Sequence, residues 1–139
     1  MKYYVFADGA SKGNPGESSI GGICFKDRIQ NLPEFIDNGQ FVFSISKRIG
    51  RKTNNEAEYL SLITALEHLK EHNIQTAEIY MDSELIVRQI NGIYKVKKEN
   101  LIPLWRRANE LRKNMDLTFS HVPREKNQIA DYLANQALK

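Results

Sequence analysis

The spacing of the apolar residues changes once along this chain of 139 residues, from a strand period to a helix period, and that change limits the possible folds most. Three strand-like segments come first, at residues 3–7, 20–25 and 40–46. The first is apolar on both faces, and the third alternates, with Phe41, Phe43 and Ile45 on one predicted face. Because no helix is predicted between these segments, we expect an antiparallel meander, with a tight loop at residues 8–16.

From about residue 54 onward the apolar residues follow a helical period. Asn54 or Asn55 is expected to cap a helix that ends near Glu71. The elements that follow are a strand at 77–81, a helix capped by Asp82 or Ser83 and ending near 90, a helix at 101–113, a strand at 117–122 and a helix at 127–138. Because helices separate the later strands, those strands should run parallel to the first. The sequence predicts one α/β domain over residues 1–139, with a mixed five-stranded sheet flanked by helices, the first three strands antiparallel and the last two parallel to strand 1.

The composition limits the possible partners and compartments. Twenty Lys and Arg against 17 Asp and Glu give a net charge of +3, which permits an anionic partner without requiring one. The single cysteine, Cys24, excludes an intrachain disulfide and a cysteine-based zinc site. The apolar start of the chain is too short for a signal peptide or a membrane span, so a cytoplasmic protein without membrane contact is expected.

Glu58 is the most informative single residue. On a helical wheel at about 100° per residue, Leu62, Ala65 and Leu69 lie within about 40° of Glu58, whereas Glu56 lies on the far side. Glu58 is therefore expected on the face that packs against the sheet, where an ionised carboxylate is costly unless it is paired or bound to metal. The alternative is a carboxylate at the rim of this face, bonded to a basic neighbour.

Three other acids share parts of this pattern. Asp8 and Asp82 each follow an apolar strand, so parallel neighbouring strands would bring both into the crevice where α/β sheets bind ligands. The alternatives are a turn residue for Asp8 and a helix cap for Asp82. Asp131 lies at the border of the apolar stripe of the last helix, a position that by itself favours a solvated flank residue. Clustered carboxylates favour Mg²⁺ or Mn²⁺, and two divalent ions would balance four acids and support phosphodiester hydrolysis.

Four segments, in order, resemble type 1 ribonuclease H in its compact form. These are Asp8-Gly9 with Gly13-Asn14-Pro15-Gly16, Thr53-Asn54-Asn55-Glu56-Ala57-Glu58, Met81-Asp82-Ser83, and residues 121–134 with His121, Asn127 and Asp131. Each segment supplies one acid, and together they span nearly the whole chain. The resemblance implies the ribonuclease H fold and a two-metal endoribonuclease that hydrolyses the RNA strand of RNA–DNA hybrids, leaving 5′-phosphate and 3′-hydroxyl ends.

The resemblance also implies roles for named residues. It makes Asp8, Glu58, Asp82 and Asp131 the catalytic acids that hold two Mg²⁺ ions, with Mn²⁺ as a substitute. His121 resembles the catalytic loop histidine of the family, although the Val-Pro-Arg-Glu that follows is stiffer than a glycine-containing loop, and a strand-end residue without chemistry is the alternative.

Substrate contacts are likewise implied by the resemblance. The residues concerned are Gly9, Asn14, Thr53, Asn54 and Asn55. The asparagines match residues that contact the hybrid, including RNA 2′-hydroxyl groups, and Thr53 matches a residue that holds a DNA phosphate. Helix capping is the alternative for Asn54 and Asn55.

The chain departs from longer family members between Gly92 and Trp105, where they carry an inserted basic helix and loop. Here the connection supplies only Lys95, Lys97 and Lys98, which either bind phosphate or are solvated surface residues. We therefore expect modest affinity with strong salt dependence. Glu84 stands where family members commonly have a glutamine. The carboxylate lacks the amide donor and adds a negative charge, so contact with the substrate there should weaken.

Other functions on the same fold are a catalytically silent nucleic-acid-binding domain and a nuclease for double-stranded RNA or DNA junctions. The four acids argue against a silent domain, and the Asn-Asn-x-x-Glu pattern argues against the junction nuclease. The expected partner is an RNA–DNA hybrid, bound by a monomer with no obligate protein partner.

Overall fold

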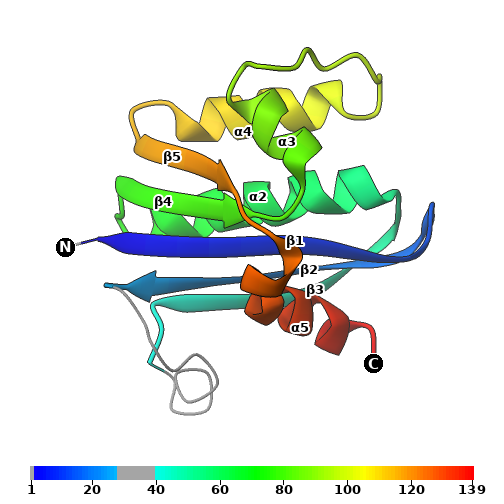
Figure 1. Cartoon of the computed structure of the whole chain (residues 1–139), viewed down its shortest axis with the longest axis horizontal. Helices are drawn as coiled ribbons and strands as arrows, with labels where there is room; N and C mark the ends of the chain where they lie inside the picture. The colour runs from blue at the N-terminus through cyan, green and yellow to red at the C-terminus, as the bar shows by residue number, and fades with distance from the viewer. Residues whose placement is uncertain (1, 28–39) are drawn as a thin grey trace.

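The computed structural model describes residues 2–27 and 40–139. Its centre is a five-stranded sheet in the order β3-β2-β1-β4-β5 (Figure 1). The strands are β1 (Tyr3–Gly13), β2 (Gly16–Lys26), β3 (Phe43–Lys52), β4 (Thr76–Met81) and β5 (Asp116–His121). β1, β2 and β3 pair antiparallel, whereas β4 is parallel to β1 and β5 is parallel to β4. The predicted α/β architecture and strand directions are confirmed.

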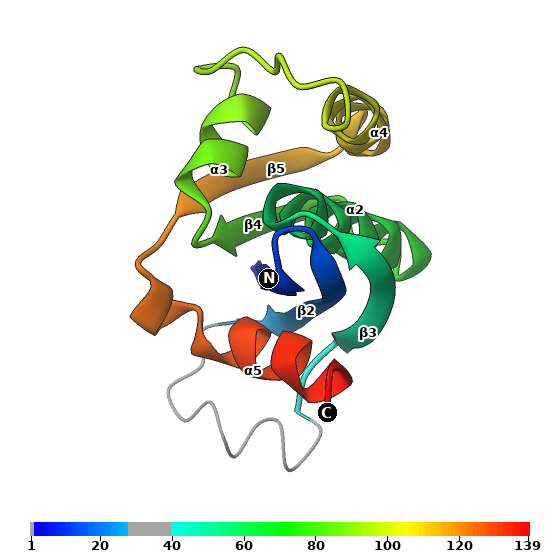
Figure 2. The ribbon, with the colours of Figure 1, turned by 90° about the vertical axis from the view of Figure 1, so that its right-hand side faces the viewer.

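Helices cover both faces of the sheet. They are α2 (Asn54–Glu71), α3 (Glu84–Ile90), α4 (Ile102–Arg112) and α5 (Gln128–Ala137), with a 3₁₀ turn at Arg124–Lys126. α2 packs on one side of β1 and β2, and α5 packs on the opposite side, as the end-on view shows (Figure 2). Among the described helices, none combines the length and apolar character needed to cross a bilayer.

Alternating side chains of β1 separate two apolar layers. Val5 and Ala7 are fully buried in the larger core, which includes residues of α2, α3 and α4. Phe6 points the other way and packs with Phe25 and Leu133 beneath α5. β1 is therefore a central strand covered on both faces, in agreement with its apolar sequence.

The prediction of a loop at residues 8–16 is wrong. β1 continues to Gly13 and pairs with β2 down to Gly13 and Gly16, so the turn itself is only Asn14-Pro15. Turn-forming residues can remain in a strand here because their main-chain groups pair and their polar side chains find partners. The hydroxyl of Ser18, for example, lies 3.0 Å from the Ser11 hydroxyl and donates to the Lys52 carbonyl at 3.1 Å.

Two local expectations also need correction. The N-cap of α2 is Thr53 rather than Asn54 or Asn55, because Thr53 forms a reciprocal capping box with Glu56, with bonds of 3.1 and 2.8 Å. Phe41 packs on the α5 side, whereas Phe43 and Ile45 belong to the larger core, because regular alternation starts only where β3 begins at Phe43. The expected absence of a helix between the second and third strands concerns residues 28–39, which lie outside the described residues.

Candidate active site

The carboxyl end of β4 places Asp82 beside Asp8 of β1. Ala7 and Met81 are parallel partners in the sheet. The residues that follow them, Asp8 in β1 and Asp82 after β4, therefore lie side by side at the same end of the two strands. β4 ends at Met81, whereas β1 continues with β2 as its partner. The gap beyond β4 therefore opens next to both carboxylates, as the sequence predicted for neighbouring parallel strands.

A third acid, Glu58, enters from the first turns of α2. This helix lies so close to β1 that a Cβ atom on Gly9 would come within 2.4 Å of the Ala57 carbonyl carbon. The absence of a side chain at Gly9 therefore allows the approach. The Gly9 main-chain N–H donates to Glu58 Oε1 at 3.0 Å, which fixes one oxygen of the carboxylate. Glu58 is 8% exposed, in agreement with its predicted inward orientation.

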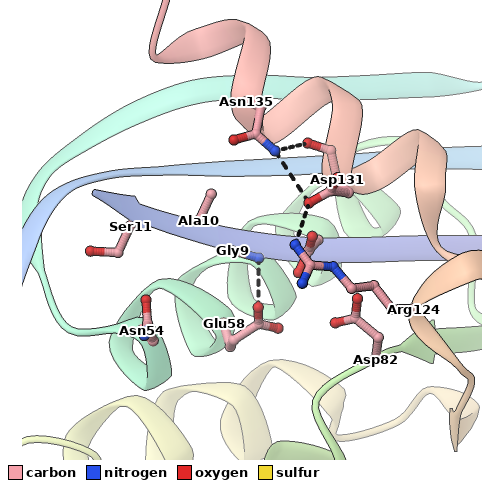
Figure 3. Close-up of a pocket in the computed structure, with 10 residues that line it drawn as sticks. Gly9, Ala10, Ser11, Asn54, Glu58, Asp82, Arg124, Asp131 and Asn135 are labelled. Carbon is pink, nitrogen blue, oxygen red and sulfur yellow. Dashed lines mark hydrogen bonds and ion pairs between the residues drawn. The ribbon is translucent and has the colours of Figure 1, made fainter. Parts of the chain in front are cut away.

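Asp8, Glu58 and Asp82 form a compact group of carboxylates. One oxygen from each lies within 4.8 Å of the others. Asp8 is 5% exposed, and Asp82 is half-buried. The three side chains face a cleft of about 440 Å³ in which Figure 3 shows Glu58 and Asp82 pointing toward one another from α2 and the end of β4.

The electrostatics of this group favour either protons or a cation. Burial, with the adjacent Glu58 carboxylate second, raises the pKa of Asp8. Burial likewise raises the pKa of Glu58, and it raises the pKa of Asp82 although Asp8, Asn127 and Arg124 act in the opposite direction. Within the described part of the chain, Glu58 Oε2 is buried without a hydrogen-bond partner. Hard oxygen donors, surplus negative charge and an unpartnered oxygen fit Mg²⁺ or Mn²⁺.

Asp131 lines the same cleft but stands apart from the compact group of three. It lies in the first turn of α5, and its side chain is 33% exposed. Arg124 approaches its Oδ1 at 3.9 Å, and Asn135 donates to the same oxygen at 3.2 Å (Figure 3). The structure thus brings three of the four predicted acids together and places the fourth at the rim.

Asn127 joins α5 to the sheet at this point. Asn127 is 1% exposed, and its Nδ2 donates at 3.0 Å to the carbonyl of Ala7, the residue before Asp8. Contact with Asn127 also opposes the rise in the pKa of Asp82. Asn127 therefore ties together the three elements that bear Asp8, Asp82 and Asp131.

A second cavity, of about 270 Å³, lies next to the N-terminus of α2. Its walls are formed by Asn14, Thr53, Asn55, Lys98, Asn100 and Leu101. Asn14 is anchored there, since its Oδ1 accepts from the Asn54 main-chain N–H at 3.0 Å. Three predicted substrate contacts thus share this cavity, while Gly9 and Asn54 line the first cleft.

The geometry gives less support to a catalytic role for His121, whereas the expected weakening of substrate contact at Glu84 stays a prediction. His121 is the exposed last residue of β5, paired in register with Met81, and it is not among the described residues that line the first cleft. Its catalytic role stays a prediction. Glu84, in the first turn of α3, accepts a bond of 2.8 Å from Arg88.

Sequence reasoning missed several residues of the two cavities. Asn135 lies four residues after Asp131, a helical spacing that could have indicated a contact. Arg124 lies on a 3₁₀ turn that the apolar pattern does not indicate, and Asn100 belongs to a connection without periodic signal. The first cleft also includes Ala10 and Ser11, which were expected in a loop.

The chain is similar to proteins of known family. The family model described as reverse transcriptase-like matches residues 6–137. The bifunctional protein Rv2228c of Mycobacterium tuberculosis is 35% identical over 139 residues, which are 99% of this chain and 36% of that protein. A protein named ribonuclease H from Chlorobium phaeobacteroides is 30% identical over 155 aligned positions, covering 99% of this chain and 96% of that one. The chain thus spans little more than a third of the first of these relatives.

A solved structure extends the likeness to three dimensions. LC11-RNase H1 in complex with an RNA/DNA hybrid superimposes with a TM-score of 0.85 at 37% identity, covering 98% of this chain and 96% of that one. The likeness therefore extends over nearly the whole backbone of both chains.

Proposed function

The chain belongs to the type 1 ribonuclease H family, and from that premise we propose that it is a metal-dependent endoribonuclease that hydrolyses the RNA strand of RNA–DNA hybrids. The observation that supports the chemistry best is the compact group of Asp8, Glu58 and Asp82, whose oxygens lie within 4.8 Å of one another. Among the described ion pairs, none involves these three carboxylates, and Arg124, which also lines the cleft, pairs with Asp131 at 3.9 Å.

These carboxylates would hold divalent cations, with Asp131 contributing from the opposite side of the cleft. When bound, such ions supply an activated water and stabilise charge on the leaving oxygen of a phosphodiester. The chain's own residues orient the site. The Gly9 N–H fixes Oε1 of Glu58, and the other carboxylate oxygen, Oε2, points toward Asp82 (Figure 3). Burial of Asp8 and Glu58 limits the access of solvent to these two carboxylates.

The RNA–DNA hybrid is the substrate that the neighbouring surface supports. Asn54 lies in the first cleft beside the acids and offers an amide to 2′-hydroxyl groups, which distinguish RNA from DNA. The second cavity combines the hydroxyl of Thr53 with the ammonium group of Lys98, a pair of donors suited to a phosphate of the other strand. The hybrid seen in the LC11-RNase H1 complex agrees with this substrate class.

The direct test uses labelled RNA–DNA hybrid, RNA duplex and DNA duplex, each incubated with Mg²⁺ or Mn²⁺. We expect cleavage of the RNA strand of the hybrid, with 5′-phosphate and 3′-hydroxyl product ends. Asp82→Asn should abolish cleavage, while Asp116→Asn, a change at an exposed aspartate of β5, should not. Cleavage of the RNA duplex alone, or full activity of Asp82→Asn, would refute the proposal.

A further inference from the structure

Asn135 makes a pair of contacts with the fourth acid that the proposed mechanism does not yet use. Its Nδ2 donates to the main-chain carbonyl of Asp131 at 2.9 Å and to the Asp131 carboxylate at 3.2 Å. Both residues line the first cleft, and Figure 3 shows them one helical turn apart on α5, with Asp131 nearer to Arg124.

Helix formation alone does not explain this side chain. Asparagine is a poor residue for a helix interior, and its amide often bonds a carbonyl one turn earlier. Asn109 of α4 does only that, donating to the Trp105 carbonyl at 3.0 Å. Asn135 differs because the same amide also reaches a carboxylate that lines the cleft.

Asn135 is also the closer of the two donors on Asp131. The guanidinium of Arg124 lies 3.9 Å from Oδ1, and its side chain is 82% exposed, so that pair is largely screened by water. The amide lies closer to Oδ1, at 3.2 Å, and belongs to the same helix as Asp131, so its bond favours one orientation of the carboxylate. Outer contacts of this kind orient metal ligands in many proteins.

We propose that Asn135 is a positioning residue that holds the Asp131 carboxylate toward the cleft, facing the group formed by Asp8, Glu58 and Asp82. The proposal rests on the proposed function, because the orientation of Asp131 matters only if the cleft holds divalent cations. Loss of the amide leaves Asp131 free to turn toward solvent and toward Arg124. The cation site then loses a well-oriented oxygen donor, although no ligand has been removed.

The test compares Asn135→Ala and Asn135→Leu with Asn109→Ala. Asn135 is exposed, and alanine and leucine are better helix formers, so the thermal midpoints should not fall. We expect both Asn135 variants to lose about tenfold in kcat on the hybrid, with KM changed less than about twofold, and to need more Mg²⁺ for half-maximal rate. Calorimetric titration with Mn²⁺ without nucleic acid should show affinity reduced about tenfold. Asn109→Ala should match the wild type in all three measurements.

Each result decides one question. Reduced kcat and reduced Mn²⁺ affinity in both Asn135 variants support the positioning role. Wild-type kcat and wild-type Mn²⁺ affinity in these variants would overturn it. If the wild-type chain cleaves none of the substrates, the proposed function fails, and the Mn²⁺ titration alone then decides whether Asn135 orients Asp131.

Discussion

The main-chain N–H of Gly9 and the carboxylate of Glu58, 49 residues apart in the sequence, are joined by a 3.0 Å hydrogen bond. This bond exists because β1 and α2 touch where Gly9 has no side chain. The same contact that packs a helix on the sheet therefore also orients a carboxylate of the candidate cation site.

Gly9→Ala should damage both packing and the site. The added Cβ would meet main-chain atoms of Ala57 and Glu58 at 2.4–2.7 Å, and neither can rotate away. We expect a loss of about 3 kcal/mol in the free energy of unfolding, measured by urea denaturation, together with loss of hybrid cleavage. Gly50→Ala is not a suitable control because Gly50 has a φ of +80°. Ala10→Ser, in the same strand, leaves Gly9 in place and should keep the wild-type free energy of unfolding. An equal loss of this free energy in both variants would show that the close contact between Gly9 and α2 is not the cause.

Glu58→Gln and Glu56→Gln separate an inward carboxylate from an outward one. Glu58→Gln removes a charge from the buried group and should lower kcat by more than the roughly 10–100-fold seen for outer partners of metal ligands. Glu56→Gln preserves the capping box, in which glutamine also serves, and should leave kcat unchanged. Similar kcat losses in the two variants would mean that the burial of Glu58 is irrelevant to catalysis.

Stability without metal should fall as the pH rises. Burial raises the pKa of Asp8, Glu58 and Asp82 in the folded chain, so the folded state binds protons that the unfolded state releases above about pH 4. The stabilisation is full below that pH and is lost as the pH rises through the raised pKa values. Mg²⁺ competes with those protons for the carboxylates. Millimolar Mg²⁺ should therefore raise the thermal midpoint more at about pH 8 than at about pH 5. Calorimetry that finds the same increase at both values would argue against a shared carboxylate site.

Lys98 should contribute to substrate affinity rather than to turnover. It is exposed and lines the cavity with Thr53 and Asn55. Lys98→Ala should raise KM for the hybrid, leave kcat unchanged, and reduce the slope of log affinity against log salt by about one. Lys70→Ala is the control, because Lys70 lies near the other end of α2, about 24 Å from its N-terminus. An unchanged salt slope would identify Lys98 as a solvated surface residue.

The spacing of apolar residues predicted most of the fold, because a period of two is typical of a strand with one buried face and a period of 3.6 is typical of a helix packed on a sheet. Glu58 was located from its helical position alone, since a charge among Leu62, Ala65 and Leu69 must face the sheet. Likewise, the border position of Asp131 agrees with its one-third exposed side chain.

The sequence was less informative where long-range contacts decide the structure. Residues 8–13 extend β1 because β2 supplies partners for their main-chain groups, which local turn propensity does not indicate. Thr53 caps α2 through a Thr-x-x-Glu spacing that is visible in the sequence, although Asn54 and Asn55 are equally good caps on composition. The contact of Arg124 with Asp131 depends on a 3₁₀ turn that has no apolar period.

Asp8, Glu58 and Asp82 together should hold a divalent cation. This can be measured in crystals of the protein soaked with Mn²⁺, by anomalous diffraction at the manganese edge. We expect an anomalous peak within coordination distance of an oxygen from each of the three side chains, and loss of that peak in Asp82→Asn. A peak elsewhere on the surface, with none in this cleft, would contradict it.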